Sequence, residues 1–218
     1  MTGKNKPTLP DRPTLERERR LIRAGHALIA GIDEAGRGAW AGPVVAAAVI
    51  LNLREAARLR EVNDSKQLSP RQRDKLYQIV IDHCVAYGIG QGSTEEIDTI
   101  GIVPATRLAM TRAIQALQPQ PDALIIDAVR LPQVNKPQLV FNFADAISLS
   151  VAAASILAKV TRDRWLIDLD AQYPAYHFAR HKGYGTRIHQ AALQSVGPCP
   201  IHRRSFRPIS ALLAERLI

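Results

Sequence analysis

Cysteine is scarce in this chain: its 218 residues include only two, Cys84 and Cys199. They lie far apart and form no Cys-x-x-Cys pair, so the sequence supports neither a disulfide framework nor a zinc site. Such sparing use of cysteine is typical of a reducing compartment. Long apolar runs are also missing. The longest, residues 39–51, is broken by Gly42 and Pro43, whereas a membrane-spanning helix needs roughly 20 apolar residues.

The first 13 residues also lack the apolar core of a signal peptide. We therefore expect a cytoplasmic protein with no membrane partner. This segment is polar and basic and contains proline, so we interpret residues 1–13 as a flexible basic tail. Residues 14–218 are expected to form a single domain that includes a helical C-terminal region over about residues 174–218.

Acidic residues are outnumbered, with 20 Asp and Glu against 29 Lys and Arg, which gives a formal net charge of +9 and a pI of about 10.0. A basic surface favours polyanionic partners, because each Lys or Arg placed on a phosphate releases a condensed counterion. Composition alone is equally compatible with a soluble basic protein that binds no nucleic acid. Hydrophobic residues make up 46% of the chain, which excludes global disorder.

Hydrophobic patterning predicts strands that alternate with helices. Two sequences, one from Ser69 to Gln72 and one from Ser93 to Glu96, are capping boxes that predict helix starts, and Thr14 is expected to cap a helix ending near Gly25. A break is expected before Pro104. The strands are predicted at residues 28–33, 44–51, 84–92, 123–127 and 139–143, and a long helix at about 148–173. This alternation predicts an α/β domain with a mixed central sheet and flanking helices.

Four acidic residues stand out because they follow predicted strands. Asp33 and Glu34 end the first strand, Asp127 ends the apolar stretch Leu124-Ile125-Ile126, and Asp145 follows the strand at 139–143. Residues just past strand ends converge in the crevice where α/β sheets bind ligands. Four carboxylates gathered there would repel one another, and Mg²⁺ or Mn²⁺ would resolve that repulsion because hard cations prefer oxygen ligands.

Two such ions can activate a water and stabilise the leaving oxygen of a phosphodiester. Taken singly, however, a strand-end Asp or Glu is more often a turn or cap residue than a ligand. Spacing alone therefore does not separate the two interpretations.

Six blocks in order closely resemble the ribonuclease HII family, from about residue 30 to residue 208. The first runs from Gly31-Ile32-Asp33-Glu34-Ala35-Gly36-Arg37-Gly38 into Gly42-Pro43-Val44-Val45. The others are Asp64-Ser65-Lys66, Leu124-Ile125-Ile126-Asp127, the stretch from Ala152 to Asp163, His181-Lys182-Gly183-Tyr184-Gly185-Thr186, and Gly197-Pro198 through His202-Arg203 to Ser205-Phe206.

The resemblance implies a ribonuclease H-like fold and an endoribonuclease that cuts the RNA strand of RNA–DNA hybrids. It implies cleavage on the 5′ side of single ribonucleotides embedded in duplex DNA, which leaves a 5′-phosphate and a 3′-hydroxyl. The family's four metal-binding acids fall on Asp33, Glu34, Asp127 and Asp145, its Gly-Arg-Gly element on Gly36, Arg37 and Gly38, and its junction-reading tyrosine on Tyr184. The partner is then nucleic acid, and the protein is expected to act as a monomer.

Physical chemistry is consistent with those roles. A site that distinguishes RNA from DNA must detect a 2′-hydroxyl, and Gly36 and Gly38 lack Cβ atoms that would keep their backbone from a sugar. Tyr184 can stack on a base or sugar and donate through its hydroxyl. Lys66 and Lys182 sit in loops and are candidates to hold phosphates. Without the surrounding motifs, a plain turn, a core tyrosine and solvated lysines are the simpler interpretations.

Two departures from the family pattern stand beside the acids. Many bacterial members have glycine after the third acid and before the fourth, where this chain has Ala128 and Ala144. Both are replacements of one small residue by another, so they bear on local backbone geometry and leave the acids in place.

Several motif-like features are given structural interpretations. The string Gly88, Gly90, Gly92 lacks the helix-opening pattern of a dinucleotide site, so we interpret it as flexibility at a strand end. His177 and His181 have helical ligand spacing but no Glu between them, which argues against a zinc protease site. Asp163 is expected to form a salt bridge with Lys159 one turn earlier.

Two alternative functions remain open at this point. A DNA nuclease of the same fold, such as a resolvase or integrase, would carry similar acids, although the Gly-Arg-Gly element and Tyr184 argue against it. A non-catalytic hybrid-binding protein would not need four intact acids.

Overall fold

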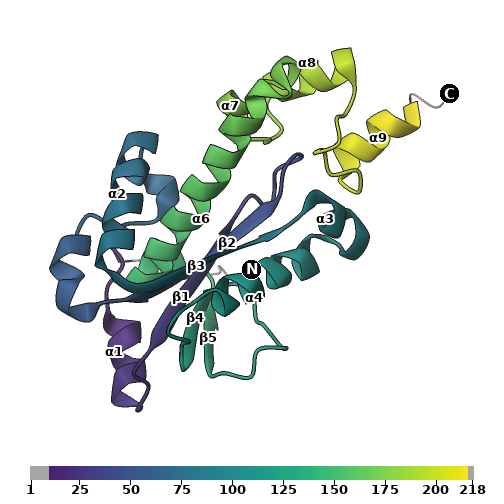
Figure 1. The fold of residues 1–218 in the computed structure, drawn as a ribbon. Coiled ribbons are helices and arrows are strands. Elements are labelled where there is room, and N and C mark those ends of the chain that lie inside the picture. The colour runs from purple at the N-terminus through teal and green to yellow at the C-terminus, as the bar shows by residue number, and fades with distance from the viewer. Residues whose placement is uncertain (1–9, 216–218) are drawn as a thin grey trace, which may run out of the picture.

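The computed structural model describes residues 10–215, which form one mixed five-stranded sheet in the order β3-β2-β1-β4-β5 (Figure 1). β1 pairs antiparallel with β2 and parallel with β4; β2 pairs antiparallel with β3, and β4 pairs parallel with β5. This topology confirms the predicted mixed α/β sheet. The strands are β1 (Ile29–Ala35), β2 (Val44–Leu51), β3 (Cys84–Gly92), β4 (Ala123–Asp127) and β5 (Gln138–Phe141).

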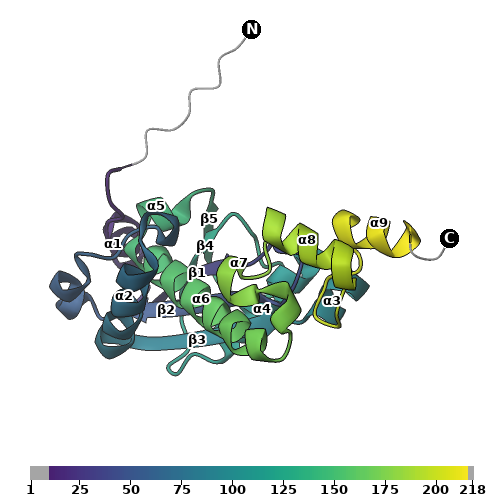
Figure 2. The ribbon, with the colours of Figure 1, turned by 90° about the horizontal axis from the view of Figure 1, so that it is seen from above.

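Helices cover both faces of the sheet. The α-helices are α1 (Glu16–Arg23), α2 (Pro70–His83), α3 (Thr94–Ile100), α4 (Ile102–Gln115), α5 (Ala144–Ile147), α6 (Leu149–Asp168), α7 (Phe178–His181), α8 (Arg187–Val196) and α9 (Arg207–Glu215). Four short 3₁₀ turns are η1 (Leu53–Leu59), η2 (Ser65–Gln67), η3 (Leu169–Ala171) and η4 (Pro174–Tyr176). Seen from above, α6 runs across one face with α2 beside it (Figure 2).

The strand β2 lies between β3 and β1 in the sheet and is buried along its whole length. Its side chains alternate between the two faces. Ala46 and Ala48 pack in the core that α4 completes, while Ala47 and Val49 pack in the core formed with α2 and α6. A strand covered on both faces needs apolar side chains throughout, which is why its sequence shows no polar alternation.

The glycines of β3 have a structural role that differs from our interpretation. Gly88, Gly90 and Gly92 lie within the strand rather than forming a flexible end. A Cβ atom on these residues would lie 2.1, 2.2 and 2.7 Å from the carbonyl oxygens of Ala113, Ala109 and Ala105. The glycine string therefore allows α4 to approach the strand closely.

Local capping chemistry fixes several helix starts as predicted. Ser69 and Ser93 both form complete capping boxes, with Gln72 and Glu96 as their third helical residues. The expected break before Pro104 falls at Gly101, and Pro104 lies inside the first turn of α4. One expectation was wrong in detail: helix α1 has Leu15, not Thr14, at its N-cap.

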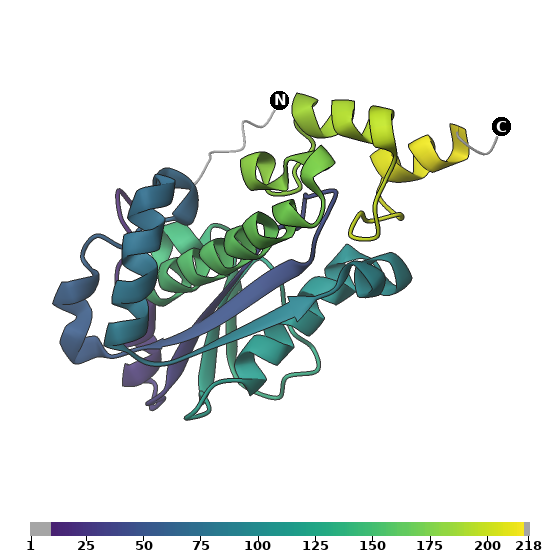
Figure 3. The ribbon, with the colours of Figure 1, turned by 45° about the horizontal axis from the view of Figure 1, so that its top comes forward.

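The C-terminal region extends beyond the end of α6 and the sheet (Figure 3). It has its own small core, in which Phe178, Leu193 and Ile209 are buried against Leu166 of α6. Residues 1–9 of the expected tail lie outside the described residues. Within the described part, Arg12 Nη1 donates to the carbonyl of Arg60 at 3.0 Å. None of the helices between residues 10 and 215 is both long and apolar enough to cross a membrane.

Candidate active site

Three of the four predicted acids lie where the parallel strands β1 and β4 end side by side. The register pairs Ile32 with Ile126, so Asp127, the last residue of β4, lies beside Asp33. The predicted end of β1 was two residues short. Asp33 and Glu34 both lie within the strand, opposite Ala47 and Ala46 of β2. The extra strand residues hold the acids rigidly, because β2 continues beside them.

The fourth acid, Asp145, enters from α5 and is buried, with 2% of its surface exposed. Asp127 Oδ1 accepts a hydrogen bond of 2.7 Å from the backbone N–H of Ala144, immediately before Asp145. The strand β5 ends at Phe141, earlier than predicted, and Phe143 adopts a left-handed conformation that turns the chain into α5. These two features bring Asp145 to the end of β4.

The four acids lie close enough to raise one another's pKa values. Burial raises the pKa of Asp33 well above its ordinary value, and the negative charges of Glu34, Asp127 and Asp145 raise it further. Burial is also the largest cause of the raised pKa values of Glu34, Asp127 and Asp145. The structure therefore brings together all four predicted acids in a site with an excess of negative charge.

Two cationic side chains partly offset that charge. Lys66 Nζ lies 2.5 Å from Asp145 Oδ2 and 3.1 Å from Oδ1 of Asp64. Burial lowers the pKa of Lys66, but its bonds to Asp145 and Asp64 outweigh that effect and raise it overall. Arg37 Nη1 lies 3.1 Å from Glu34 Oε1. Asp64 was missed as a site residue, although it lies in the same short sequence block as Lys66.

A divalent metal fits the chemistry of this donor set. Glu34 Oε2 is buried and has no hydrogen-bond partner in the structure, and an orphaned buried carboxylate oxygen is costly without a compensating cation. All four acids offer oxygen donors, which Mg²⁺ and Mn²⁺ prefer.

Over residues 10–215, however, no three Asp, Glu, His or Cys side chains are already arranged as a metal-binding group. The hydrogen bonds explain this. Asp145 faces Lys66, Glu34 faces Arg37, and Asp127 caps Ala144. Metal binding thus requires some of these carboxylates to exchange partners.

The loop from Gly36 to Gly38 follows β1 directly, beside the acids. Gly38 is exposed, and nothing lies within 4 Å of a Cβ built on it. Gly36 is buried with φ at +93°, and a Cβ there would lie 1.9 Å from Nε of Arg162. The structure thus explains the glycine at position 36 differently from our expectation. The absence of a side chain there makes room for Arg162 inside the protein, not for a sugar.

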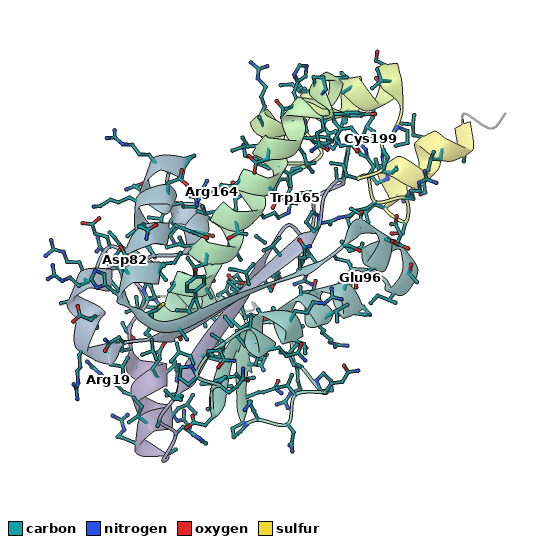
Figure 4. All side chains as sticks on the ribbon, in the orientation of Figure 1. Arg19, Asp82, Glu96, Arg164, Trp165 and Cys199 are labelled. Carbon is teal, nitrogen blue, oxygen red and sulfur yellow. The ribbon has the colours of Figure 1, made fainter. Side chains whose placement is uncertain are left out.

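Tyr184 lies on a basic groove between α2, α6 and the loop after α7. Two cationic groups lie near its ring: Lys159 Nζ and Arg162 Cζ are each 5.3 Å from the ring centroid. The groove is also lined by Arg73, Arg164, Arg180 and Lys182. Lys159 forms the predicted salt bridge with Asp163, at 2.7 Å. Figure 4 labels Arg164 on α6, where it reaches Asp74 of α2.

Lys182 differs from the expectation for a phosphate-binding lysine. Its ammonium group donates to the carbonyl of Ala179 in its own turn, and its backbone carbonyl accepts from Arg162. Lys182 therefore lies in the groove, and within residues 10–215 it forms no hydrogen bond or salt bridge with any of the four acids.

Two buried arginines, Arg162 and Arg203, were not singled out from the sequence. Both have 0% exposure, and each donates three hydrogen bonds to backbone carbonyls: Arg203 to Gly36, Arg37 and Gly42, and Arg162 to Ala41, Pro43 and Lys182. Both arginines lie within blocks that resemble the family, which could have marked them as functional candidates. Nothing in those blocks, however, indicates which arginine is buried.

A ribonuclease H-like sheet with buried acids at its strand ends and a basic groove beside them defines a nuclease, a hydrolase of phosphodiester bonds. Comparison with known proteins agrees. The family model described as Ribonuclease HII matches residues 30–209. Ribonuclease HII of Chloroflexus aurantiacus is 53% identical over 206 residues, which cover 93% of this chain and 97% of that protein.

The fold is also that of solved ribonucleases H. The ribonuclease H2 of Pyrococcus horikoshii superposes with a TM-score of 0.73 at 28% identity, over 87% of this chain and 98% of that one. The Bst ribonuclease HIII, crystallised in complex with Mn²⁺, shares the fold with a TM-score of 0.64 at 18% identity, over 86% of this chain and 70% of that one. This chain belongs to the ribonuclease HII family, and that membership indicates ribonuclease H activity.

Proposed function

We propose that this nuclease cuts the RNA strand of RNA–DNA hybrids and cleaves on the 5′ side of single ribonucleotides embedded in duplex DNA. The products would be a 5′-phosphate and a 3′-hydroxyl, and the protein would act as a monomer. In this proposal Asp33, Glu34, Asp127 and Asp145 hold Mg²⁺ or Mn²⁺.

The observation that carries the proposal is the convergence of four acids, of which Asp33 and Asp145 are buried and the other two half-buried, with one oxygen, Glu34 Oε2, left without a partner. A pair of divalent ions bound there would activate water and stabilise the leaving oxygen. The protein's own cations support the same assignment, because Lys66 and Arg37 already bind two of the acids and show that these carboxylates attract positive charge.

The surroundings supply recognition. Backbone groups of Gly36, Arg37 and Gly38 would contact the ribose, and Tyr184 would stack at the junction between ribonucleotide and DNA. The basic groove with Arg73, Lys159, Arg164, Arg180 and Lys182 would follow the phosphate backbone and add affinity without sequence preference.

The decisive experiment compares two labelled duplexes that differ only at one nucleotide, which is either a ribonucleotide or its deoxy equivalent. With Mg²⁺ or Mn²⁺ we expect cleavage of the first alone, at the phosphodiester 5′ to the ribonucleotide, with the ends mapped by ligation and phosphatase treatment. Equal cleavage of the all-DNA duplex would favour a resolvase or integrase activity instead.

A variant pair then tests the acids. Asp127→Asn keeps an oxygen for the N–H of Ala144 but removes the charge, so cleavage should fall by about a hundredfold or more while hybrid binding persists. Asp82→Asn is the matched control, because Asp82 is exposed on α2, where its side chain accepts a hydrogen bond from Gln78 (Figure 4). If Asp127→Asn cleaved as well as Asp82→Asn, the proposed metal ligands would be wrong.

A further inference from the structure

The Gly36–Gly38 loop is held from within by two buried guanidinium groups. Arg203 donates to the carbonyl oxygens of Gly36 at 2.8 Å, Arg37 at 2.9 Å and Gly42 at 2.9 Å. Each nitrogen of the guanidinium takes one carbonyl. Three bonds in a rigid planar fork fix the orientation of the peptide groups that they reach.

Arg162 packs against the same loop and also forms a hydrogen bond to the loop that contains Tyr184. It donates to the carbonyl oxygens of Pro43, Ala41 and Lys182, each at 2.9 Å. Its Nε occupies the space where a side chain on Gly36 would begin, and its guanidinium lies under the ring of Tyr184. One side chain thus connects the two loops that flank the acids.

Both arginines are unusual because their guanidinium groups are fully buried and are not paired with a carboxylate among the described residues. Within residues 10–215, neither guanidinium forms a salt bridge with a carboxylate. Burial lowers the pKa of each, although an arginine stays protonated at neutral pH. Two buried cations at close range are destabilising for the fold, so their placement calls for a role beyond packing.

The geometry of the peptide unit indicates that role. A trans peptide is planar, with its C=O and N–H pointing in opposite directions. The carbonyls of Gly36 and Arg37 point toward Arg203, so the N–H groups of the next residues, Arg37 and Gly38, point away from it. Among the described residues, neither of these two N–H groups has an acceptor in the protein, and Gly38 is exposed.

We propose that Arg203, backed by Arg162, is a positioning residue that orients the N–H groups of Arg37 and Gly38 toward the 2′-oxygen of the substrate ribonucleotide. This inference rests on the proposed function. The positive charge behind the two peptide groups also polarises them and makes their N–H groups stronger donors to an oxygen. Discrimination for ribose is therefore set by a side chain that does not touch the substrate.

The experiment measures how strongly binding and cleavage depend on the 2′-hydroxyl of the substrate. A replacement at a purely structural residue would not change that dependence. Duplexes with one ribonucleotide or its deoxy equivalent are bound to the protein in EDTA, and fluorescence anisotropy gives the ratio of their two affinities. Cleavage of the ribonucleotide duplex in Mg²⁺ gives kcat and KM. The variant Arg203→Lys keeps the charge but cannot reach three carbonyls, and Arg204→Lys is the control because Arg204 is exposed beside it.

For Arg203→Lys we expect the affinity ratio to fall toward one and kcat to fall by about tenfold, the effect of losing one or two charge-assisted hydrogen bonds. The all-DNA duplex should bind as it does to the unmodified protein, and Arg204→Lys should change neither quantity. Circular dichroism and the unfolding temperature establish that the variant is folded. If Arg203→Lys does not fold, Arg203→Gln, which retains two donors on a neutral group, carries the same comparison.

Two results would overturn the inference. One is an unchanged affinity ratio in a folded Arg203 variant, which would make Arg203 a structural residue only. The other is an equal loss of affinity for both duplexes. Failure of the proposed function would look different, because the unmodified protein itself would then show no dependence on the 2′-hydroxyl in binding or cleavage.

Discussion

Lys66 Nζ lies 2.5 Å from Asp145 Oδ2, so an ammonium group of the protein holds one of the four acids at the proposed metal site. Lys66 comes from the 3₁₀ turn η2 and Asp145 from α5, two segments 79 residues apart in the chain. A divalent cation that binds Asp145 through the same oxygen must displace this lysine. If Asp145 is a metal ligand as we propose, Lys66 competes with the metal for it.

Replacing Lys66 by glutamine should increase metal affinity. The side chain of Lys66 is 73% exposed, and exposed ion pairs contribute little, so the gain is expected to be about two- to fivefold in the dissociation constant for Mn²⁺. Isothermal titration with Mn²⁺ measures it. Lys75→Gln is the control, because Lys75 pairs with Glu61 at 2.8 Å away from the site. Weaker Mn²⁺ binding by Lys66→Gln than by Lys75→Gln would show that Lys66 does not compete.

Ala128 is strained, and glycine there should stabilise the protein. Its φ is +54°, a left-handed conformation that an alanine adopts at a cost. After allowing for the greater freedom of glycine in the unfolded chain, Ala128→Gly should raise the free energy of unfolding by about 0.5 to 1 kcal/mol. Urea unfolding followed by circular dichroism measures the change.

The second departure from the family pattern serves as the matched control. Ala144 opens α5 and is not among the residues with positive φ. Ala144→Gly should therefore lower the free energy of unfolding by about 0.5 to 1 kcal/mol, since glycine is unfavourable in a helix. Opposite signs for the two variants are expected. The same sign for both would mean that backbone conformation does not control these positions.

Glu18 should be a strong stabilising residue of α1. It is buried, and its Oε1 accepts hydrogen bonds from Ser148 Oγ at 2.6 Å, from Ser150 N at 2.9 Å and from Ser150 Oγ at 2.7 Å. These donors lie at the N-terminus of α6, where a negative charge is favoured. Glu18→Ala should lower the free energy of unfolding by about 2 to 3 kcal/mol, whereas Glu16→Ala, at an exposed position, should change it little. Equal effects of the two changes would contradict this assignment.

Stability should fall in mild acid because of two buried histidines. Burial lowers the pKa of His189 and of His202 to about 4, and their Nε2 atoms share one proton at 2.9 Å. Well above pH 6.5 both histidines are neutral whether the chain is folded or unfolded, so their titration does not change the free energy of unfolding. As the pH falls from about 6.5 to about 4, the unfolded chain takes up protons first and stability decreases, by about 3 kcal/mol per histidine at most.

Urea unfolding at a series of pH values between 8 and 4 measures this decrease. His202→Gln removes one of the two buried groups and should flatten the pH dependence. His177→Asn removes an exposed histidine and should leave it unchanged. Identical slopes for the two variants would locate the titrating group elsewhere.

The sequence predicted the mixed sheet because strand and helix patterns are local, and it singled out four acids near strand ends that the folded chain brings together. Strands β2, β3 and β4 begin and end at the predicted residues, since their apolar runs are bounded by turns and caps. The end of β1 was missed because Asp33 and Glu34 look like a strand terminus, whereas tertiary pairing with β2 continues the strand to Ala35.

Features that depend on contacts between distant segments could not be predicted. Nothing local distinguishes Arg203, buried against the Gly36–Gly38 loop, from its exposed neighbour Arg204. Nor does the sequence indicate that Lys66 pairs with Asp145, or that the glycines of β3 serve the approach of α4. In each case the partner lies elsewhere in the chain, so only the folded arrangement gives the residue its role.

The bond from Arg203 to the carbonyl of Arg37 spans 166 residues. During synthesis, the four acids have all been made by residue 145, but the loop beside them cannot receive this bond until residue 203 has left the ribosome. A product that ended between α7 and residue 203 would carry every acid and the whole of α6, and yet lack the bonds that Arg203 donates to the loop. If Arg203 positions the loop as we propose, such a fragment would discriminate between ribose and deoxyribose less well than the whole chain, and the C-terminal helices would then be part of the working nuclease.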